Sequence, residues 1–89
     1  MGVILNLSED DVGKTLTAIV DLKTNANPTF LQVRTASISQ LIKISIPVTD
    51  WATYRISHEI VSTDMYVWAY TVPNTQLNIF MDNLRITIQ

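Results

Sequence analysis

The chain of 89 residues contains no cysteine, one histidine, His58, and only two glycines, Gly2 and Gly13. Without cysteine it forms neither a disulfide framework nor a thiolate metal site. A single histidine excludes a metal site built from several imidazoles. Two isolated glycines exclude a glycine-rich phosphate loop. Disulfide frameworks, multi-histidine metal sites and glycine-rich phosphate loops are therefore removed from consideration.

Charge is also scarce, at 16% of the sequence, and six basic residues against eight acidic ones leave a net charge of −2. Proteins that bind nucleic acid through its phosphates gather lysine and arginine, so this balance argues against a nucleic-acid partner. No apolar run approaches the length of a membrane span, and the N-terminus lacks a basic-then-apolar signal pattern. We expect neither nucleic acid nor membrane among the partners.

What the chain does contain is β-branched residues, since valine, isoleucine and threonine fill 30 of the 89 positions. Short stretches of alternating apolar and polar residues recur, with turn-forming residues between them. The expected strands are 3–7, 14–22, 30–35, 42–46, 51–60, 65–72 and 77–88. A capping pattern begins at Ser8, but Gly13 limits it to one helical turn. We predict one all-β domain over residues 1–89, a jelly-roll-like antiparallel β-sandwich of about seven strands.

Three short motifs occur in the order found in a known family. They are SEDDVGKTLT at 8–17, DWATY at 50–54 and FMDNLRI at 80–86. The first resembles an acidic turn and its following strand, the second a Trp-x-x-Tyr strand start, and the third a closing strand. Together they resemble the C-terminal two-thirds of a jelly-roll domain of the carbohydrate-binding-module type. Such domains are appended to glycoside hydrolases and occur in phage tail fibres.

Relative to that family, further strands are expected before Met1, and the resemblance places part of a structural calcium site on them. A sandwich without those strands leaves an unpaired edge and uncovered apolar surface. We therefore expect a homo-oligomer, most simply a homotrimer, or a larger companion fibre chain that covers this surface. If a reading frame upstream and in phase with this one encodes a fibre, Met1 is expected to be an internal start of that longer gene.

Five of the seven aromatic residues lie within twenty positions. Period-2 geometry places Tyr66, Trp68 and Tyr70 on one side of their strand and Met65, Val67 and Ala69 on the other. Saccharides stack on aromatic rings, so the three rings are candidate carbohydrate contacts. Alternatively, the rings fill the core or a subunit interface, and their large size favours this alternative. The resemblance implies a structural role for Trp51, which we leave out of the site.

Acidic side chains offer two candidate calcium sites, at Asp82-Asn83 and at the run 9–11. Calcium takes six to eight oxygen ligands, and two neighbouring strand residues point to opposite faces, so they cannot both coordinate one ion without a bulge. A hydrogen bond to a neighbouring segment is the favoured role for Asp82 and Asn83, and a solvated turn is favoured for the acidic run. We expect no metal and no cofactor.

Catalysis would need a pair of carboxylates or an activated base. Nothing in the spacing brings Glu59 and Asp82 together across a cleft, as glycoside hydrolysis requires. His58 is expected to point inward between Ile56 and Ile60, as a core or interface residue. We therefore assign no catalytic residue and expect no enzyme.

The leading hypothesis is a non-catalytic β-sandwich of a phage tail or fibre. It would assist assembly or presentation of a receptor-binding protein and contact host cell-wall saccharide from the virion. One alternative is a secreted carbohydrate-binding module that targets a polysaccharide for an attached enzyme. The other is a structural virion subunit without a ligand.

Overall fold

The computed structural model describes residues 2–37, 40–71 and 79–89, and these residues form seven strands and one turn of 3-10 helix. The elements are β1 (Gly2–Ile4), η1 (Glu9–Asp11), β2 (Thr15–Thr24), β3 (Thr29–Thr35), β4 (Gln40–Ile46), β5 (Thr49–Glu59), β6 (Met65–Thr71) and β7 (Ile79–Ile88). The predicted all-β fold of about seven strands is confirmed. The first strand is shorter than expected, and the predicted strand ends Val72 and Leu77 lie outside the described residues.

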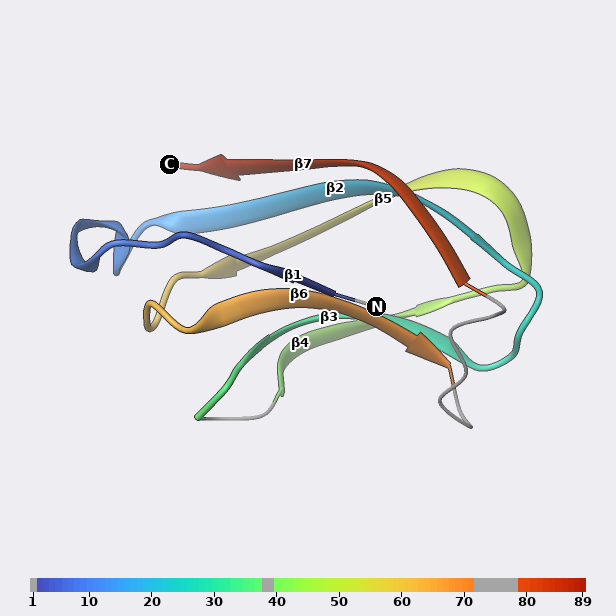
Figure 1. Ribbon diagram of the computed structural model, residues 1–89, viewed down its shortest axis with the longest axis horizontal. Helices are drawn as coiled ribbons and strands as arrows, with labels where there is room; N and C mark the ends of the chain where they lie inside the picture. The colour runs from blue at the N-terminus through green and yellow to red at the C-terminus, as the bar shows by residue number, and fades with distance from the viewer. Residues whose placement is uncertain (1, 38–39, 72–78) are drawn as a thin grey trace.

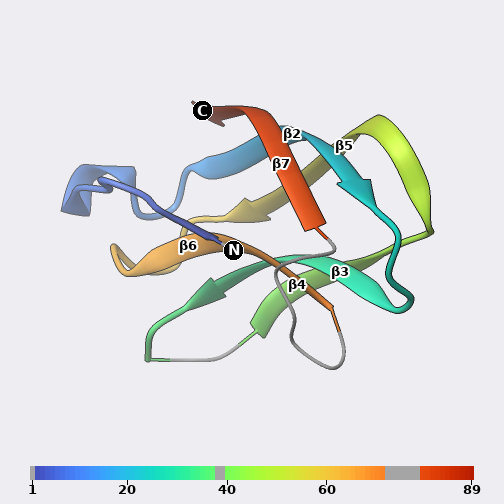
Figure 2. The same ribbon diagram turned by 45° about the vertical axis from the view of Figure 1, so that its right-hand side comes forward.

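The strands form two antiparallel sheets that pack face to face (Figure 1). Sheet A has the order β1-β6-β3-β4, and sheet B has the order β5-β2-β7. Only β3 and β4 are successive strands of one sheet, so the chain changes sheet between every other pair of successive strands. Figure 2 shows the same two layers crossing at an angle, as the twist of each sheet requires. Among the described residues, no helix is long and apolar enough to cross a membrane.

The core lies between the sheets and follows from strict alternation along the central strands. On β2 the residues Leu16, Ala18, Val20 and Leu22 have no exposed surface. From sheet A they meet a matching set on β3, β4 and β6, namely Leu31, Val33, Ile46, Met65, Val67 and Ala69. A shift of register by one residue would turn all these side chains to solvent, so the alternation sets which face of each sheet is free.

The closing strand β7 contains a bulge beside its partner β2. Ile19 lies opposite Arg85 and Asp21 opposite Asp82, so two residues of β7 face the single residue Val20. Asn83 takes a φ of 54°, in the left-handed region that asparagine adopts more readily than most residues. Asp82 and Asn83 therefore lie in a bulge and not in a regular strand, so alternation alone does not separate their side chains.

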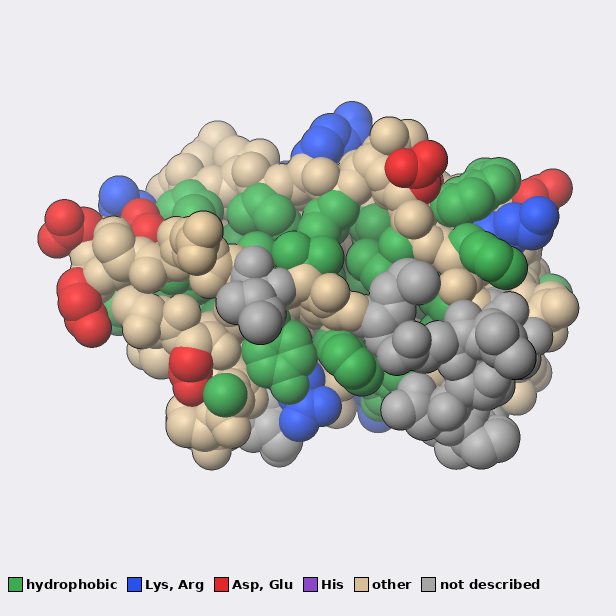
Figure 3. All heavy atoms as spheres, viewed as in Figure 1, with side chains coloured by type: hydrophobic (Ala, Val, Ile, Leu, Met, Phe, Trp, Pro, Cys, Tyr) green, Lys and Arg blue, Asp and Glu red, His purple; other side chains and the backbone are tan. Residues whose placement is uncertain are grey.

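No strand within the described residues covers one long side of the sandwich, the open side between β1 of sheet A and β7 of sheet B. β1 has three residues against ten in β7, so it covers little of the second sheet's inner face. The inward residues Leu84, Ile86 and Ile88 remain only half-buried, and a hollow of about 400 Å³ separates Val3 from Leu84. Figure 3 shows hydrophobic side chains in a band along the middle of this view, between the two sheets.

Candidate functional site

The residues Tyr66, Trp68 and Tyr70 lie on the outer face of sheet A. The alternate residues of β6 point inward, and Val67 and Ala69 have no exposed surface. Because the core takes these small side chains, the three rings stand on the other side of the sheet, where each is half-exposed. The sequence left open whether these rings fill the core, fill a subunit interface or contact saccharide. Filling of this chain's own core is wrong for them.

Register with the neighbouring strand β3 extends this row into a face of two strands. Phe30 lies opposite Tyr70, with ring centroids 5.3 Å apart and a tilt of 36° between the ring planes. Gln32 lies opposite Trp68, in the centre. Arg34 lies opposite Tyr66 and carries its guanidinium carbon 5.5 Å from the centroid of that ring.

Two further contacts hold the rings in fixed orientations. Tyr66 meets Trp68 edge to face, with an interplanar angle of 89° and centroids 6.3 Å apart. On the other flank, the ammonium of Lys43 on β4 lies 4.5 Å from the centroid of Phe30. Edge-to-face aromatic pairs and cations over ring faces are both favourable arrangements. The aromatic face, defined here as the outward side chains of β3 and β6 together with Lys43, is thus ordered by its own contacts.

The middle of the aromatic face holds a polar group among large side chains. Gln32 is only 3% exposed although it points away from the core. Trp68 and Lys43 lie opposite it on the two neighbouring strands, and Phe30 and Arg34 lie two residues away along its own strand. An amide that is flanked by rings offers both a hydrogen-bond donor and an acceptor.

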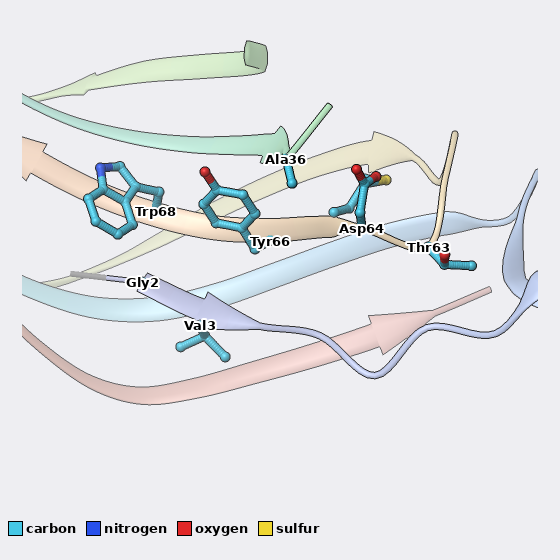
Figure 4. A pocket seen from close by; sticks show the side chains of 8 residues that line it. Gly2, Val3, Ala36, Thr63, Asp64, Tyr66 and Trp68 are labelled. Atoms are coloured by element: carbon cyan, nitrogen blue, oxygen red, sulfur yellow. The ribbon is translucent and has the colours of Figure 1, made fainter. Parts of the chain in front are cut away.

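Beside the aromatic face lies a hollow of about 500 Å³ (Figure 4). Tyr66 and Trp68 line one side, Gly2 lines the opposite side, and Thr63 and Asp64 lie at one end. A methyl group at Gly2 would lie 3.0 Å both from the Cζ3 atom of Trp68 and from the backbone oxygen of Val67. The close approach of β1 to the indole therefore requires glycine.

Asp64 is anchored at the end of that hollow by hydroxyl and backbone donors. Its Oδ2 atom accepts a hydrogen bond from the backbone N–H of Ser37 at 3.1 Å and another from the Ser37 hydroxyl at 2.9 Å. Its Oδ1 atom accepts one from the hydroxyl of Ser62. The Ser62 bond, followed by the Ser37 bonds, lowers the pKa of the Asp64 carboxyl below its ordinary value. Asp64 is thus ionised at neutral pH.

Trp51, which the resemblance assigns to a structural position, is 50% exposed on the outer face of β5. It lies on sheet B, away from the three rings of β6. His58 is half-buried, and its Nδ1 atom lies 2.7 Å from the backbone oxygen of Glu59.

Glu59 and Asp82 do not meet. They lie opposite Thr15 and Asp21 on β2, six residues apart, which corresponds to roughly 20 Å along a strand. A glycosidase pair needs a separation of at most about 10 Å.

The candidate calcium positions take part in other bonds. The amide nitrogen of Asn83 donates to Oδ2 of Asp21 at 2.9 Å, and Oδ1 of Asp21 accepts from the Thr53 hydroxyl at 2.6 Å. In the acidic run, the backbone N–H of Ser8 donates to Oδ2 of Asp11 at 3.0 Å. Over the described ranges, no group of three or more acidic or histidine side chains is placed to hold a metal ion.

Alternation along β3 places Gln32 and Arg34 on the outside of their strand, but nothing in the sequence connects these two residues with the three rings. The connection depends on β3 and β6 being neighbours in sheet A, although 29 residues separate the two strands along the chain. Local alternation carries no signal for that pairing.

Comparisons of the chain with protein-family models, with curated proteins and with solved structures found no match. The family resemblance drawn from three short motifs therefore remains a prediction. Function is argued below from the geometry of the aromatic face.

Proposed function

We propose that this protein is a non-catalytic β-sandwich that contacts saccharide through the aromatic face. In the setting that the resemblance suggests, it would help to present a receptor-binding protein on a phage tail or fibre. The observation that carries the proposal is the row Tyr66, Trp68 and Tyr70, half-exposed on the outside of a sheet whose core is already complete.

The physical match is between flat rings and sugar rings. The carbon-bound hydrogens of a pyranose face stack on an aromatic ring, while the hydroxyls at its edge need donors and acceptors in the same plane. The aromatic face offers both kinds of contact. Its rings are steadied by one another and by Arg34, and the amide of Gln32 lies between them. Few side chains would need to be ordered on binding, which favours affinity.

The hollow beside Trp68 supports a ligand larger than one sugar ring. It continues from the indole towards Thr63, whose hydroxyl suits the hydroxyl groups of a sugar, and it ends at Asp64. A volume of about 500 Å³ lies within the range typical of small-molecule sites. A chain of sugar units would thus extend from the rings of β6 into this hollow.

Assembly is the second part of the proposal and concerns another surface. The open side between β1 and β7 leaves Leu84, Ile86 and Ile88 half-buried beside an edge of β7 that no described strand pairs with. Further copies of the chain would cover this surface and leave the aromatic face free. A trimer, as the fibre setting suggests, would carry three aromatic faces and multiply a weak affinity for a repeating glycan.

The test compares two tryptophans on opposite faces. Trp68→Ala and Trp51→Ala make the same chemical change, but Trp51 lies on sheet B and is 50% exposed. Binding to a glycan array and to purified bacterial cell walls is measured for both variants, together with the mass by light scattering and the melting temperature. We expect Trp68→Ala to weaken binding at least about tenfold and Trp51→Ala to leave it unchanged.

The accompanying measurements separate saccharide contact from a subunit interface. At a saccharide site, mass is unchanged, and the stability lost with Trp68→Ala stays well below the about 3–5 kcal/mol of a fully buried tryptophan. Loss of assembly and stability together would instead make the aromatic face a subunit interface, as in a structural virion subunit without a ligand. Failure of the wild-type protein to bind any glycan or cell wall would overturn the proposal.

A further inference from the structure

We propose that the aromatic face selects acidic saccharides, and that Arg34 and Lys43 bind the acidic group. The inference rests on the proposed function and names the ligand class of the same site. Either a carboxylate, as on a uronic or sialic acid, or a phosphate substituent on the sugar would meet the two cations. The shared chemistry is a saccharide that carries a negative charge.

The first argument is the distribution of charge over the molecule. The chain as a whole has a net charge of −2, yet β3, β4 and β6 contain Arg34, Lys43 and no acidic residue. The outer face of sheet A therefore carries two positive charges on an otherwise acidic protein. Such a local reversal raises the concentration of anions near the face and suppresses the approach of cations.

The second argument is that neither cation has an acidic partner within the described part of the chain. Elsewhere, Lys14 lies 3.7 Å from Asp11, and Lys23 lies 3.9 Å from Asp50. Arg34 and Lys43 instead lie over the rings of Tyr66 and Phe30. A ring face orients a cation without neutralising it, so both remain available to an anion.

The third argument concerns the half-buried guanidinium of Arg34. Its Nε atom is buried and makes no hydrogen bond to any described residue. A buried N–H without a partner is costly, and such groups in folded proteins call for an explanation. The remaining N–H donors of this guanidinium, held against Tyr66, form a fork that suits the two oxygens of a carboxylate or phosphate.

The placement of the two cations also suits a ligand that stacks on the rings. Gln32 lies opposite Lys43 on one side and opposite Trp68 on the other, and Arg34 lies opposite Tyr66 in the next outward row. A sugar over Trp68 and Gln32 would thus have Lys43 near one edge and Arg34 near another. Asp64 stands at the far end of the hollow, where three hydrogen bonds from Ser37 and Ser62 already engage its oxygens.

The experiment begins with the wild-type chain on an array that carries neutral, carboxylate-bearing and phosphate-bearing glycans. We expect retention of acidic glycans over their neutral counterparts and weaker binding as salt is raised. Two further arms use the best-retained glycan after methyl esterification of its carboxyls or enzymatic removal of its phosphate. Loss of binding after one of these two treatments identifies whether the carboxylate or the phosphate is the group that is bound.

Three methionine variants then locate the charge. Arg34→Met and Lys43→Met remove one cation each while they keep an apolar stem, and each should weaken binding of the acidic glycan at least about tenfold. Arg55→Met removes a cation from the outer face of sheet B and should leave binding unchanged. Melting temperatures show whether each variant is folded, and the two face variants act at separate sites, so unfolding of one leaves the other as a test.

The outcomes separate this inference from the proposed function. Binding of neutral glycans alone, or acidic binding that both face variants retain, would overturn the selection of acidic saccharides while saccharide contact stands. Binding of no glycan at all would overturn both. Acidic binding that falls with Arg55→Met as much as with Arg34→Met would also contradict the inference, because it would reflect net charge and not this site.

Discussion

Gln32 on β3 lies directly opposite Trp68 on β6, and the two side chains share the outer face of sheet A. One is an amide that is 3% exposed, and the other is a half-exposed indole. This pair joins the two requirements of saccharide contact, an apolar plane and a hydrogen-bonding amide beside it. It forms because the inner face of the same strands is filled by Leu31, Val33 and Val67.

The amide of Gln32 supplies the first prediction. Gln32→Leu keeps most of the side-chain volume but removes the donor and the acceptor, so we expect glycan affinity to fall about tenfold. Stability should change by less than about 1 kcal/mol, since leucine has a similar volume and can pack against the neighbouring rings of Trp68 and Phe30. Titration with the best-retained glycan and thermal melting measure the two effects. Unchanged affinity would remove Gln32 from the binding site.

The second prediction concerns the dependence of stability on pH. Hydrogen bonds lower the pKa of three carboxyls in the folded state: the backbone N–H of Ser8 acts on Asp11, the side chains of Asn83 and then Thr53 act on Asp21, and Ser62 and then Ser37 act on Asp64. Groups with a lowered folded-state pKa stabilise the fold above the unfolded value, near 3.8, and this contribution is lost as the pH falls through the folded values.

We therefore expect the melting temperature to be nearly constant from pH 7 to pH 5 and to fall below about pH 4, where the unfolded chain takes up protons first. Asp64→Asn removes one of these carboxyls and should reduce the fall in melting temperature below about pH 4. Asp10→Asn is the matched control, since Asp10 is an exposed carboxyl beside Asp11 without a hydrogen bond among those described. A melting temperature that rises on acidification to pH 3 would contradict the assignment.

Metal removal supplies the third prediction. Addition of EDTA should leave the melting temperature unchanged, because Asn83 donates its amide to Asp21 and Oδ1 of Asp82 accepts the backbone N–H of Asn83. These bonds engage Oδ2 of Asp21 and Oδ1 of Asp82, two of the carboxylate oxygens that a calcium ion in this place would need as ligands. A fall of several degrees that calcium reverses would show a site that the hydrogen bonds conceal.

The fourth prediction concerns the open side of the sandwich. Light scattering should give a mass above the 10.0 kDa of one chain, and three chains is the state that the fibre setting suggests. Ile88→Lys places a charge among the half-buried residues of β7 and should shift the mass towards one chain. Thr87→Lys, on the exposed side of the same strand, is the control. A wild-type mass of one chain at all concentrations would contradict association.

Much of the fold was predictable from the sequence because alternation acts locally. The run from Leu16 to Leu22 turns every second side chain inward, and the structure buries those residues completely. The bulge at Asn83 was not predictable in this way. It depends on how β7 meets β2, and the bond from Asn83 to Asp21 spans 62 residues of chain.

The candidate site was predictable in part, for the same reason. Period-2 geometry grouped the three rings of β6, but it did not decide which side of that strand fills the core. The decision depends on volume, since Val67 and Ala69 fit the space above β2 that larger rings would overfill. The contributions of Phe30, Gln32 and Arg34 depend on sheet pairing, which no local pattern encodes.

The central claim is that the indole of Trp68 contacts a saccharide, and its fluorescence tests this most directly. Trp51→Phe leaves Trp68 as the sole tryptophan of the chain, because the sequence contains only two. Titration of this variant with the glycan that the array retains best should change the emission of Trp68 in a saturable way, with a midpoint equal to the dissociation constant measured by calorimetry. Binding by calorimetry without any change in this emission would contradict the claim.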